Sequence, residues 1–383
     1  MTPGQLPLAR LHCRTLLRLT AWITALGAAG LALAAPALQQ VSGSMDHNGT
    51  VTITGSGFGA KASAAPLVWD NATGSALSGQ WTGAWPDKLP GYNTGYYAPM
   101  RGIDLPHTHD TRYIAGAHAA NTGADSGYAV MVFKAIQAPA FPYFIYASWY
   151  QRVDDQWHFG GDNNFKTFDY SLGTEPYAAN QSWYTAYGPP LPGSTTDIPQ
   201  WTYEIGTPLA LPDNNGHNAW WGMAVNPMAG KWSKVEITIR VSNQKDGYVK
   251  VFENGHQVIN YSGVTDTYGG SQRTISVGGY ARMQGYPTNW RYYDDIYIDT
   301  SLQRVVLADK PVLSQATIIE PQIPTSWSDS SITATVNLGK FTQGQTAYLL
   351  VVDATGPPRA AGKAVTAGGN SFMPNAPSGV AVH

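Results

Sequence analysis

Four residues within one short stretch could carry out acid–base chemistry on a sugar acid. The candidate catalytic residues are Tyr150, Arg152, His158 and Lys166. β-Elimination beside a uronate carboxylate needs a cation to neutralise that carboxylate, and a base and an acid to move protons. Arg152 or Lys166 would neutralise, and His158 or Tyr150 would act as base and acid. The alternative interpretation is that Arg152 and Lys166 are solvated rim charges and that His158 is an ordinary loop residue.

Aromatic side chains are unusually abundant. The chain has 10 Phe, 13 Trp and 22 Tyr, many of them in loops rich in Gly, Pro and Asn. Flat rings stack on the C–H faces of sugars, so this surplus favours a sugar-binding surface. The candidate substrate-binding residues are Tyr146, Trp157, Trp220 and Trp221. The alternative is that these rings fill the core of a β-sandwich.

A histidine pair gives a weaker indication of a metal. His107 and His109 are two residues apart, His118 follows, and Asp104 and Asp110 are near in sequence. Two histidines at this spacing on a strand can bind zinc. No matching distant ligand motif stands out, so the pattern favours a surface loop that reaches into a sugar-binding groove.

Strands are the elements that must position the candidate catalytic residues. Segment 143–153 is the clearest strand of the middle region. A period of two puts Trp149 on one face and puts Tyr150 and Arg152 together on the other. If segment 165–170 pairs with this strand, Lys166 faces them.

The same alternation runs through most of the chain. Further strands are predicted at 51–54, 232–241, 248–253, 256–261, 274–283, 291–299, 330–338 and 346–353. Asn254-Gly255 predicts a tight hairpin turn. No segment beyond the N-terminal region has a convincing period of 3.6. The sequence therefore predicts an all-β protein built as a β-sandwich or jelly roll.

Composition excludes several classes of protein. Charged residues make up only 13% of the chain and the formal net charge is −2. No basic field exists to bind nucleic acid. No Walker, nucleophile-elbow or dinucleotide motif is present, so no organic cofactor is expected. The expected partner is a polysaccharide.

The N-terminal segment resembles a secretory signal peptide. Arg10, Arg14 and Arg18 precede an apolar stretch. Ala32-Leu33-Ala34 fits a cleavage site, and Ala35-Pro36-Ala37 is a second option. We therefore predict a signal peptide over 1–34 and a secreted, periplasmic or cell-surface protein, with no membrane span after the signal is removed. The alternative is a retained anchor, for which the stretch is short. The single cysteine, Cys13, leaves with the signal.

Residues 66–304 resemble the concanavalin-A-like (laminin-G-like) jelly roll of secreted polysaccharide lyases and glucanases. The resemblance is carried by 146–150, 232–240, 246–255 and 293–299. It implies a sugar-binding sheet face. It also implies a structural calcium that bridges an early strand to the last one, at Asp70 and at Asp295 or its neighbour Asp294. Glucanases of this fold share a Glu-x-Asp-x-Glu strand, which is missing here because Glu236 stands alone in its strand.

Two flanking segments resemble the immunoglobulin-like IPT/TIG fold. Residues 50–59 are similar to its first strand and glycine turn, and residues 327–336 and 347–356 to its later strands. The predicted domains are a first half over 38–65, the jelly roll over 66–304, a second half over 305–356 and a flexible tail over 357–383. A single Ig-like module with an inserted jelly roll is favoured over two unrelated terminal extensions.

Three functions follow from these patterns. The first is a polysaccharide lyase that cleaves an acidic glycan by β-elimination. The second is a non-catalytic glycan-binding or adhesive protein, and the third is a structural surface protein. The residues cited for catalysis support the first, and the aromatic surplus together with the missing carboxylate motif supports the second.

Overall fold

The computed structural model describes residues 35–72, 81–82, 96–99, 109, 112–118, 128–137, 142–153, 164–172, 180–187, 200–206, 217–222, 230–266, 272–280, 289–356 and 360–369. The predicted signal peptide and the last 14 residues of the predicted tail, 370–383, lie outside the described residues. Trp157 and His158 also lie outside them.

The described residues form strands and one short 3-10 helix, Leu313–Gln315, which confirms the all-β prediction. The strands are β1 Ala37–Gly43, β2 Thr50–Ser56, β3 Val68–Asp70, β4 Trp81–Thr82, β5 Tyr96–Pro99, β6 Arg112–His118, β7 Tyr128–Gln137, β8 Tyr143–Val153, β9 Asn164–Leu172, β10 Asn180–Tyr187, β11 Gln200–Gly206, β12 His217–Gly222, β13 Ser233–Val241, β14 Gly247–Glu253, β15 His256–Gly263, β16 Gln272–Tyr280, β17 Asn289–Asp299, β18 Arg304–Ala308, β19 Ile319–Trp327, β20 Ser331–Thr335, β21 Thr346–Val352 and β22 Lys363–Thr366. Among these residues, no helix is both long enough and apolar enough to cross a membrane.

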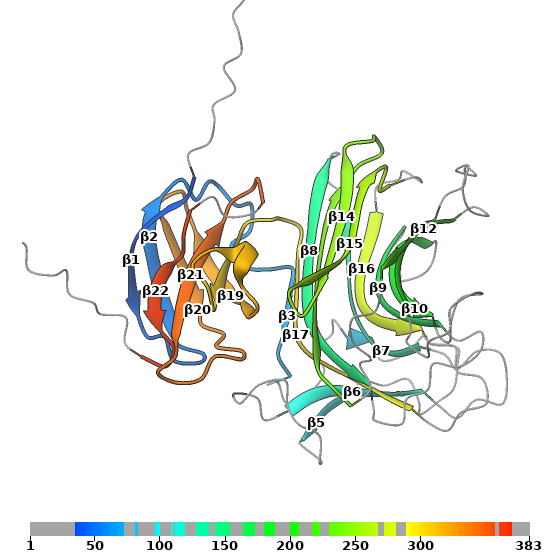
Figure 1. Ribbon diagram of the computed structural model, residues 1–383, viewed down its shortest axis with the longest axis horizontal. Helices are drawn as coiled ribbons and strands as arrows, with labels where there is room; N and C mark the ends of the chain where they lie inside the picture. Colours follow the sequence, from blue (N-terminus) through cyan, green and yellow to red (C-terminus); the bar gives the residue numbers. More distant parts are fainter. Residues whose placement is uncertain are drawn as a thin grey trace, which may run out of the picture. The chain divides into compact units, whose positions relative to one another are not determined.

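Strands from both ends of the chain form one unit, which we call the terminal module (β1, β2 and β18–β22; Figure 1). Its strand order is β1-β2-β20-β19-β18-β21-β22. Strand β2 pairs antiparallel with β20, with Thr52 opposite Thr333. Its core joins Val51 and Ile53 to Val305 and Leu349. The segments on either side of the central region therefore share one sheet, whereas membership of the IPT/TIG family stays a prediction.

Strands β3–β17 form the central sandwich, which has two sheets (Figure 1). The eight-stranded sheet has the order β15-β14-β13-β8-β17-β6-β5, and β3 also pairs with β17. The seven-stranded sheet has the order β12-β11-β10-β9-β16-β7-β4. Trp149 and Ile237 of the first sheet pack against Phe168 and Val277 of the second. The rings of Trp149 and Phe168 are stacked, with centroids 6.1 Å apart.

Strand β8 is buried on both faces. The predicted alternation is confirmed, because Ala147, Trp149 and Val153 belong to the core between the two sheets. The opposite face carries Tyr146 and Tyr150, which are also fully buried. Residues of the terminal module cover that face, as their contacts below show. A strand in this position can be polar on one side without facing water.

The predicted hairpin turn is present between β14 and β15. Asn254 has φ of 49° and Gly255 has φ of 79°. Two successive positive φ angles are what a type I′ turn requires, and Asn-Gly adopts them readily. This turn sets Glu253 opposite His256, and a register shift follows between Phe252 and Val251.

Candidate functional site

The predicted catalytic cluster is divided between two sheets. Strand β8 pairs with β13 and β17, whereas β9 pairs with β10 and β16. The expected pairing of β8 with β9 is therefore wrong. Tyr150 and Arg152 lie on the face of the eight-stranded sheet that points away from the core, so they do not face Lys166. No local signal in the connection between β8 and β9 distinguishes a hairpin from a crossing to the other sheet.

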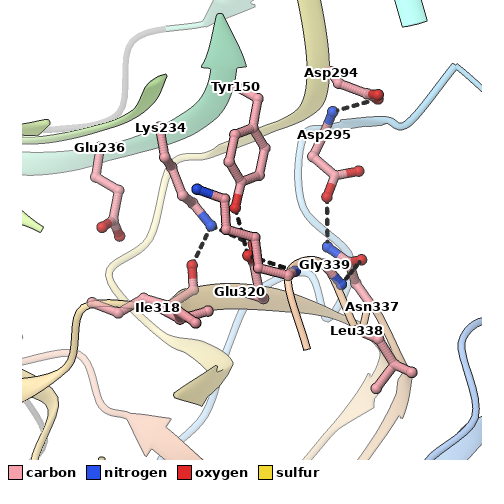
Figure 2. A network of polar contacts seen from close by, with 12 residues as sticks. Tyr150, Lys234, Glu236, Asp294, Asp295, Ile318, Glu320, Asn337, Leu338 and Gly339 are labelled. Carbon is pink, nitrogen blue, oxygen red and sulfur yellow. Dashed lines mark hydrogen bonds and ion pairs between the residues drawn. The ribbon is translucent and has the colours of Figure 1, made fainter. Parts of the chain in front are cut away.

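Tyr150 belongs to a buried polar network instead (Figure 2). Its hydroxyl donates to Glu320 Oε1 at 2.5 Å, and Lys234 Nζ lies 2.6 Å from Glu320 Oε2. Burial, followed by the negative charge of Glu320, raises the pKa of Tyr150 well above its usual value. A phenol in this position keeps its proton at neutral pH, so Tyr150 is unsuited to act as a base.

The network continues within the terminal module. Glu320 Oε1 also accepts from the backbone N–H of Lys340 at 3.2 Å. Asn337 Nδ2 donates to Asp295 Oδ2 at 2.9 Å, which ties the terminal module to β17 (Figure 2). These contacts join β8, β13 and β17 of the central sandwich to the terminal module through polar groups, and they account for the buried outer face of β8.

Arg152 is likewise packed against its own sheet. It is 7% exposed, and its guanidinium carbon lies 5.8 Å from the centre of the Tyr292 ring. Arg152 and Lys166, the two candidates to neutralise a substrate carboxylate, therefore lie on different sheets. The alternation along β8 predicts its two faces, but it does not predict that the terminal module covers the polar one.

Lys166 lies in a row that crosses the seven-stranded sheet. The register places Lys166 opposite Thr185, Thr185 opposite Thr202 and Thr202 opposite Trp221. A register shift after Tyr184 brings Thr167 toward the core, where its hydroxyl donates to Gln151, and leaves Lys166 opposite Thr185. We call Lys166, Thr185, Thr202 and Trp221 the Lys166 row.

The Lys166 row belongs to the sheet face that points away from the core. Thr185 follows the core residue Tyr184, and successive residues of a strand belong to opposite faces. Trp220 stands opposite Tyr203, and Tyr203 stands opposite Tyr184. Trp220 is therefore in the same row as the core residue Tyr184 and not in the Lys166 row. The structure thus aligns two predicted residues, Lys166 and Trp221, and separates Trp220 from them.

Tyr146 lines a cavity of about 420 Å³ on the outer face of the eight-stranded sheet. Its hydroxyl donates to Glu236 Oε1 at 2.7 Å. The guanidinium of Arg304 lies 3.9 Å from the centre of its ring. Tyr146 was predicted to bind substrate beside Trp157, Trp220 and Trp221, but it lies on a different sheet from the last two.

The loop histidine His109 contacts the terminal module. Its Nε2 lies 2.8 Å from the carbonyl oxygen of Phe341, and its ring is stacked on that of His47 with centroids 5.0 Å apart. His107, Asp104 and Asp110 lie outside the described residues, and a loop that reaches into a sugar-binding groove stays a prediction. No group of three or more His, Cys, Asp or Glu side chains within the described part of the chain could hold a metal ion.

The two predicted calcium ligands lie on paired strands. Asp70 stands opposite Ile296, next to Asp295. However, Asp70 Oδ1 accepts from the backbone N–H of Ala72 at 3.0 Å, and Asp295 Oδ2 accepts from Asn337. These oxygens are engaged within the protein and do not converge into a ligand set among the described residues, so calcium stays a prediction.

Comparisons with known proteins return likenesses of fold. No family model matches the chain, and no curated protein matches it. An endo-β-1,4-glucuronan lyase from the fungus Trichoderma reesei matches with a TM-score of 0.41 and 14% identity, over 62% of this chain and 96% of that one. The alginate lyase Aly36B, in a mutant form bound to alginate trisaccharide, matches with a TM-score of 0.43 and 12% identity, over 62% and 99%.

A further match is a toxin domain. The binding domain of botulinum neurotoxin serotype D has a TM-score of 0.35 and 9% identity, over 76% of this chain and 72% of that one. All three matches have TM-scores below 0.5, so they decide neither the family nor the activity of this chain. Activity has to be inferred from the residues of the chain.

Two residues of the terminal module, Glu320 and Arg304, were not foreseen as partners of the central sandwich. Glu320 is one of only five glutamates, and it lies fully buried against Tyr150. Arg304 contacts Tyr146 across a sequence separation that no local pattern spans. The scarcity of Glu in the chain was the one available signal that a glutamate could have a specific role.

Proposed function

We propose that the protein binds an acidic polysaccharide on the outer face of the seven-stranded sheet of the central sandwich (β12-β11-β10-β9-β16-β7-β4) and cleaves it by β-elimination. The observation that supports this is the Lys166 row, which aligns a half-buried lysine with Trp221 across four adjacent strands. Strands lie about 4.8 Å apart, so the row is about 14 Å long, enough for two or three sugar rings. A cation and an aromatic residue along one line suit a chain of uronates.

In this proposal Lys166 neutralises the uronate carboxylate. Its positive charge stabilises the negative charge that develops when the proton beside the carboxylate is removed. The electron pair of the broken C–H bond then forms a C=C bond, the glycosidic C–O bond breaks, and the leaving oxygen takes a proton. His158 is proposed as the base or the acid, since Tyr150 faces Glu320 instead.

The experiment follows the ultraviolet absorbance of the unsaturated uronate while the mature protein is mixed with a panel of acidic polysaccharides. Lys166→Gln should lower turnover at least about 100-fold, since a preorganised charge partner contributes on the order of 3 kcal/mol. Lys245→Gln, on an exposed loop of the other sheet, is the matched control and should leave turnover unchanged. A wild-type rate in Lys166→Gln would remove this residue from the site.

A second candidate function is glycan binding without cleavage. The observation that favours it is the separation of Tyr150 and Arg152 from Lys166, which leaves the Lys166 row with fewer acid–base groups than predicted. Retarded migration in a gel that contains the polysaccharide, with no rise in absorbance across the panel, would support binding alone. We also infer export, as the N-terminal pattern indicates.

A further inference from the structure

A cavity of about 420 Å³ lies between the outer face of the eight-stranded sheet and the terminal module. This volume is within the range of small-molecule sites, which is about 300–1,000 Å³. Tyr146, Glu236 and Lys250 line it from the sheet, and Arg304 and Leu313 from the terminal module. The cavity is therefore assembled from two parts of the chain that are far apart in sequence.

Arg304 is the residue that points to a ligand. It is 8% exposed, and its Nη1 donates to the carbonyl oxygen of Leu302 at 2.8 Å. Its buried Nε makes no hydrogen bond. A buried donor without an acceptor is unfavourable, and more so when it carries charge. An acceptor bound in the cavity would remove this penalty, and a guanidinium is best matched by a carboxylate.

The charges of the lining favour an anion. Arg304 and Lys250 are positive, and Glu236 is the acidic lining residue. The Glu236 carboxylate already accepts the Tyr146 hydroxyl at 2.7 Å. Lys250 is half-buried, with Nζ 5.2 Å from the centre of the Tyr248 ring. The lining thus holds one more positive than negative group.

The aromatic side chains of the lining favour a ligand that carries a ring. Tyr248 and Phe252 are half-buried and contribute aromatic rings, which stack on the C–H faces of sugars. Glu236 and Thr238 can accept hydrogen bonds from hydroxyl groups. Gln257 and Ser314 line the cavity and are exposed, so the site opens to solvent. A carboxylate on a hydroxylated ring fits all of these features.

We propose that this cavity binds an acidic monosaccharide, or the uronate at one end of an acidic glycan, with its carboxylate on Arg304. The site is separate from the Lys166 row, which lies on the other sheet. It goes beyond the proposed function and does not require cleavage. Occupancy would also strengthen the contact between the central sandwich and the terminal module, because both contribute to the lining.

The test is isothermal titration calorimetry of the mature protein with glucuronate, galacturonate, glucose and acetate. A uronate should bind at least about tenfold more tightly than glucose, which lacks the carboxylate, and than acetate, which lacks the ring. Arg304→Gln should weaken uronate binding at least about tenfold, and Lys250→Gln several-fold. Glu236→Gln should strengthen it, because it removes a like charge.

Lys245→Gln, on an exposed loop outside the cavity, is the control and should leave uronate binding unchanged. Absence of binding by either uronate, or equal affinity for glucose, would overturn the proposal. Because Arg304 packs on Tyr146, the Arg304→Gln protein is first checked by thermal melting. If it does not fold, the Lys250→Gln variant is tested in its place. An unchanged affinity for uronate in Lys250→Gln overturns the proposal. A loss of affinity in Lys166→Gln but not in Lys250→Gln would overturn it too, while supporting the proposed function.

Discussion

Glu320 is a fully buried carboxylate, and Tyr150 and Lys234 each contact one of its two oxygens (Figure 2). Glu320→Ala leaves the Lys234 ammonium buried without its anion, so we expect it to lower the free energy of unfolding by about 3–5 kcal/mol. Tyr150→Phe removes one hydrogen bond to a charged group and should cost about 1.5–3 kcal/mol. Urea denaturation measures both values.

The matched control is the exposed ion pair of Arg240 and Asp246. Its atoms are also 2.6 Å apart, but the two side chains are 32% and 49% exposed. Arg240→Gln should therefore cost less than about 1 kcal/mol. A cost as large as that of Glu320→Ala would contradict the argument that burial makes the Glu320 contacts important.

Glu253 gives the protein a pH dependence of stability. Burial raises its pKa to about 7, from 4.5 in the unfolded chain. Between these values the folded state holds the proton and the unfolded state releases it, so stability falls as the pH rises from about 4.5 to about 7. The fall is on the order of 3 kcal/mol, since each pKa unit corresponds to about 1.4 kcal/mol.

The measurement is the free energy of unfolding at pH 5 and at pH 8 in the wild type and in Glu253→Gln. The difference between the two proteins isolates the contribution of Glu253 from that of every other group. The wild type should lose more stability than the variant between these two pH values. Identical losses would show that Glu253 is ionised in the folded state.

At the scale of the strand, local patterns were sufficient to predict the elements but not their partners. Alternation predicted β8 with its bounds, and Asn254-Gly255 predicted the β14–β15 hairpin because its φ angles are a local property. The connection from β8 to β9 has no such signal, and it crosses to the other sheet. The outer face of β8 carries Tyr150, a residue type that suits a sugar, water or a buried carboxylate equally well. Only the position of Glu320 decides between them.

The pairing of β1 with β2 depends on the small size of Gly55. A Cβ on Gly55 would lie 2.0 Å from the carbonyl oxygen of Ala37, so β1 would have to move. We expect Gly55→Ala to cost about 3 kcal/mol, the upper end of the range for overpacking. Gly344→Ala is the control: Gly344 has φ of 83° and open space around it, so only the backbone strain of about 1 kcal/mol remains. Equal destabilisation in thermal melts would show that β1 adapts to the extra methyl group.

At the scale of the whole described chain, the polypeptide leaves the terminal module for the central sandwich and returns to it at adjacent points. Gln303 Nε2 donates to the carbonyl oxygen of Phe58 at 3.0 Å. Lys61 Nζ lies 2.6 Å from Asp299 Oδ2, in a buried ion pair. The segments that lead into and out of the central sandwich are thus in direct contact. Domain insertion is tolerated where chain ends lie this close, so the central sandwich should be removable.

We therefore predict that replacing residues 62–298 with a short Gly/Ser linker leaves a terminal module that folds. Its core lies among its own strands, and Glu320, which loses its partners, becomes hydrated instead of buried and unpaired. Circular dichroism should show a cooperative thermal transition. A matched variant that starts at residue 300 lacks β1 and β2, so β20 loses its pairing with β2 and the core loses Val51 and Ile53. That variant should not fold. If both melted without a transition, the terminal module would need the central sandwich for its stability, and the buried contacts of Glu320 would be a condition of folding.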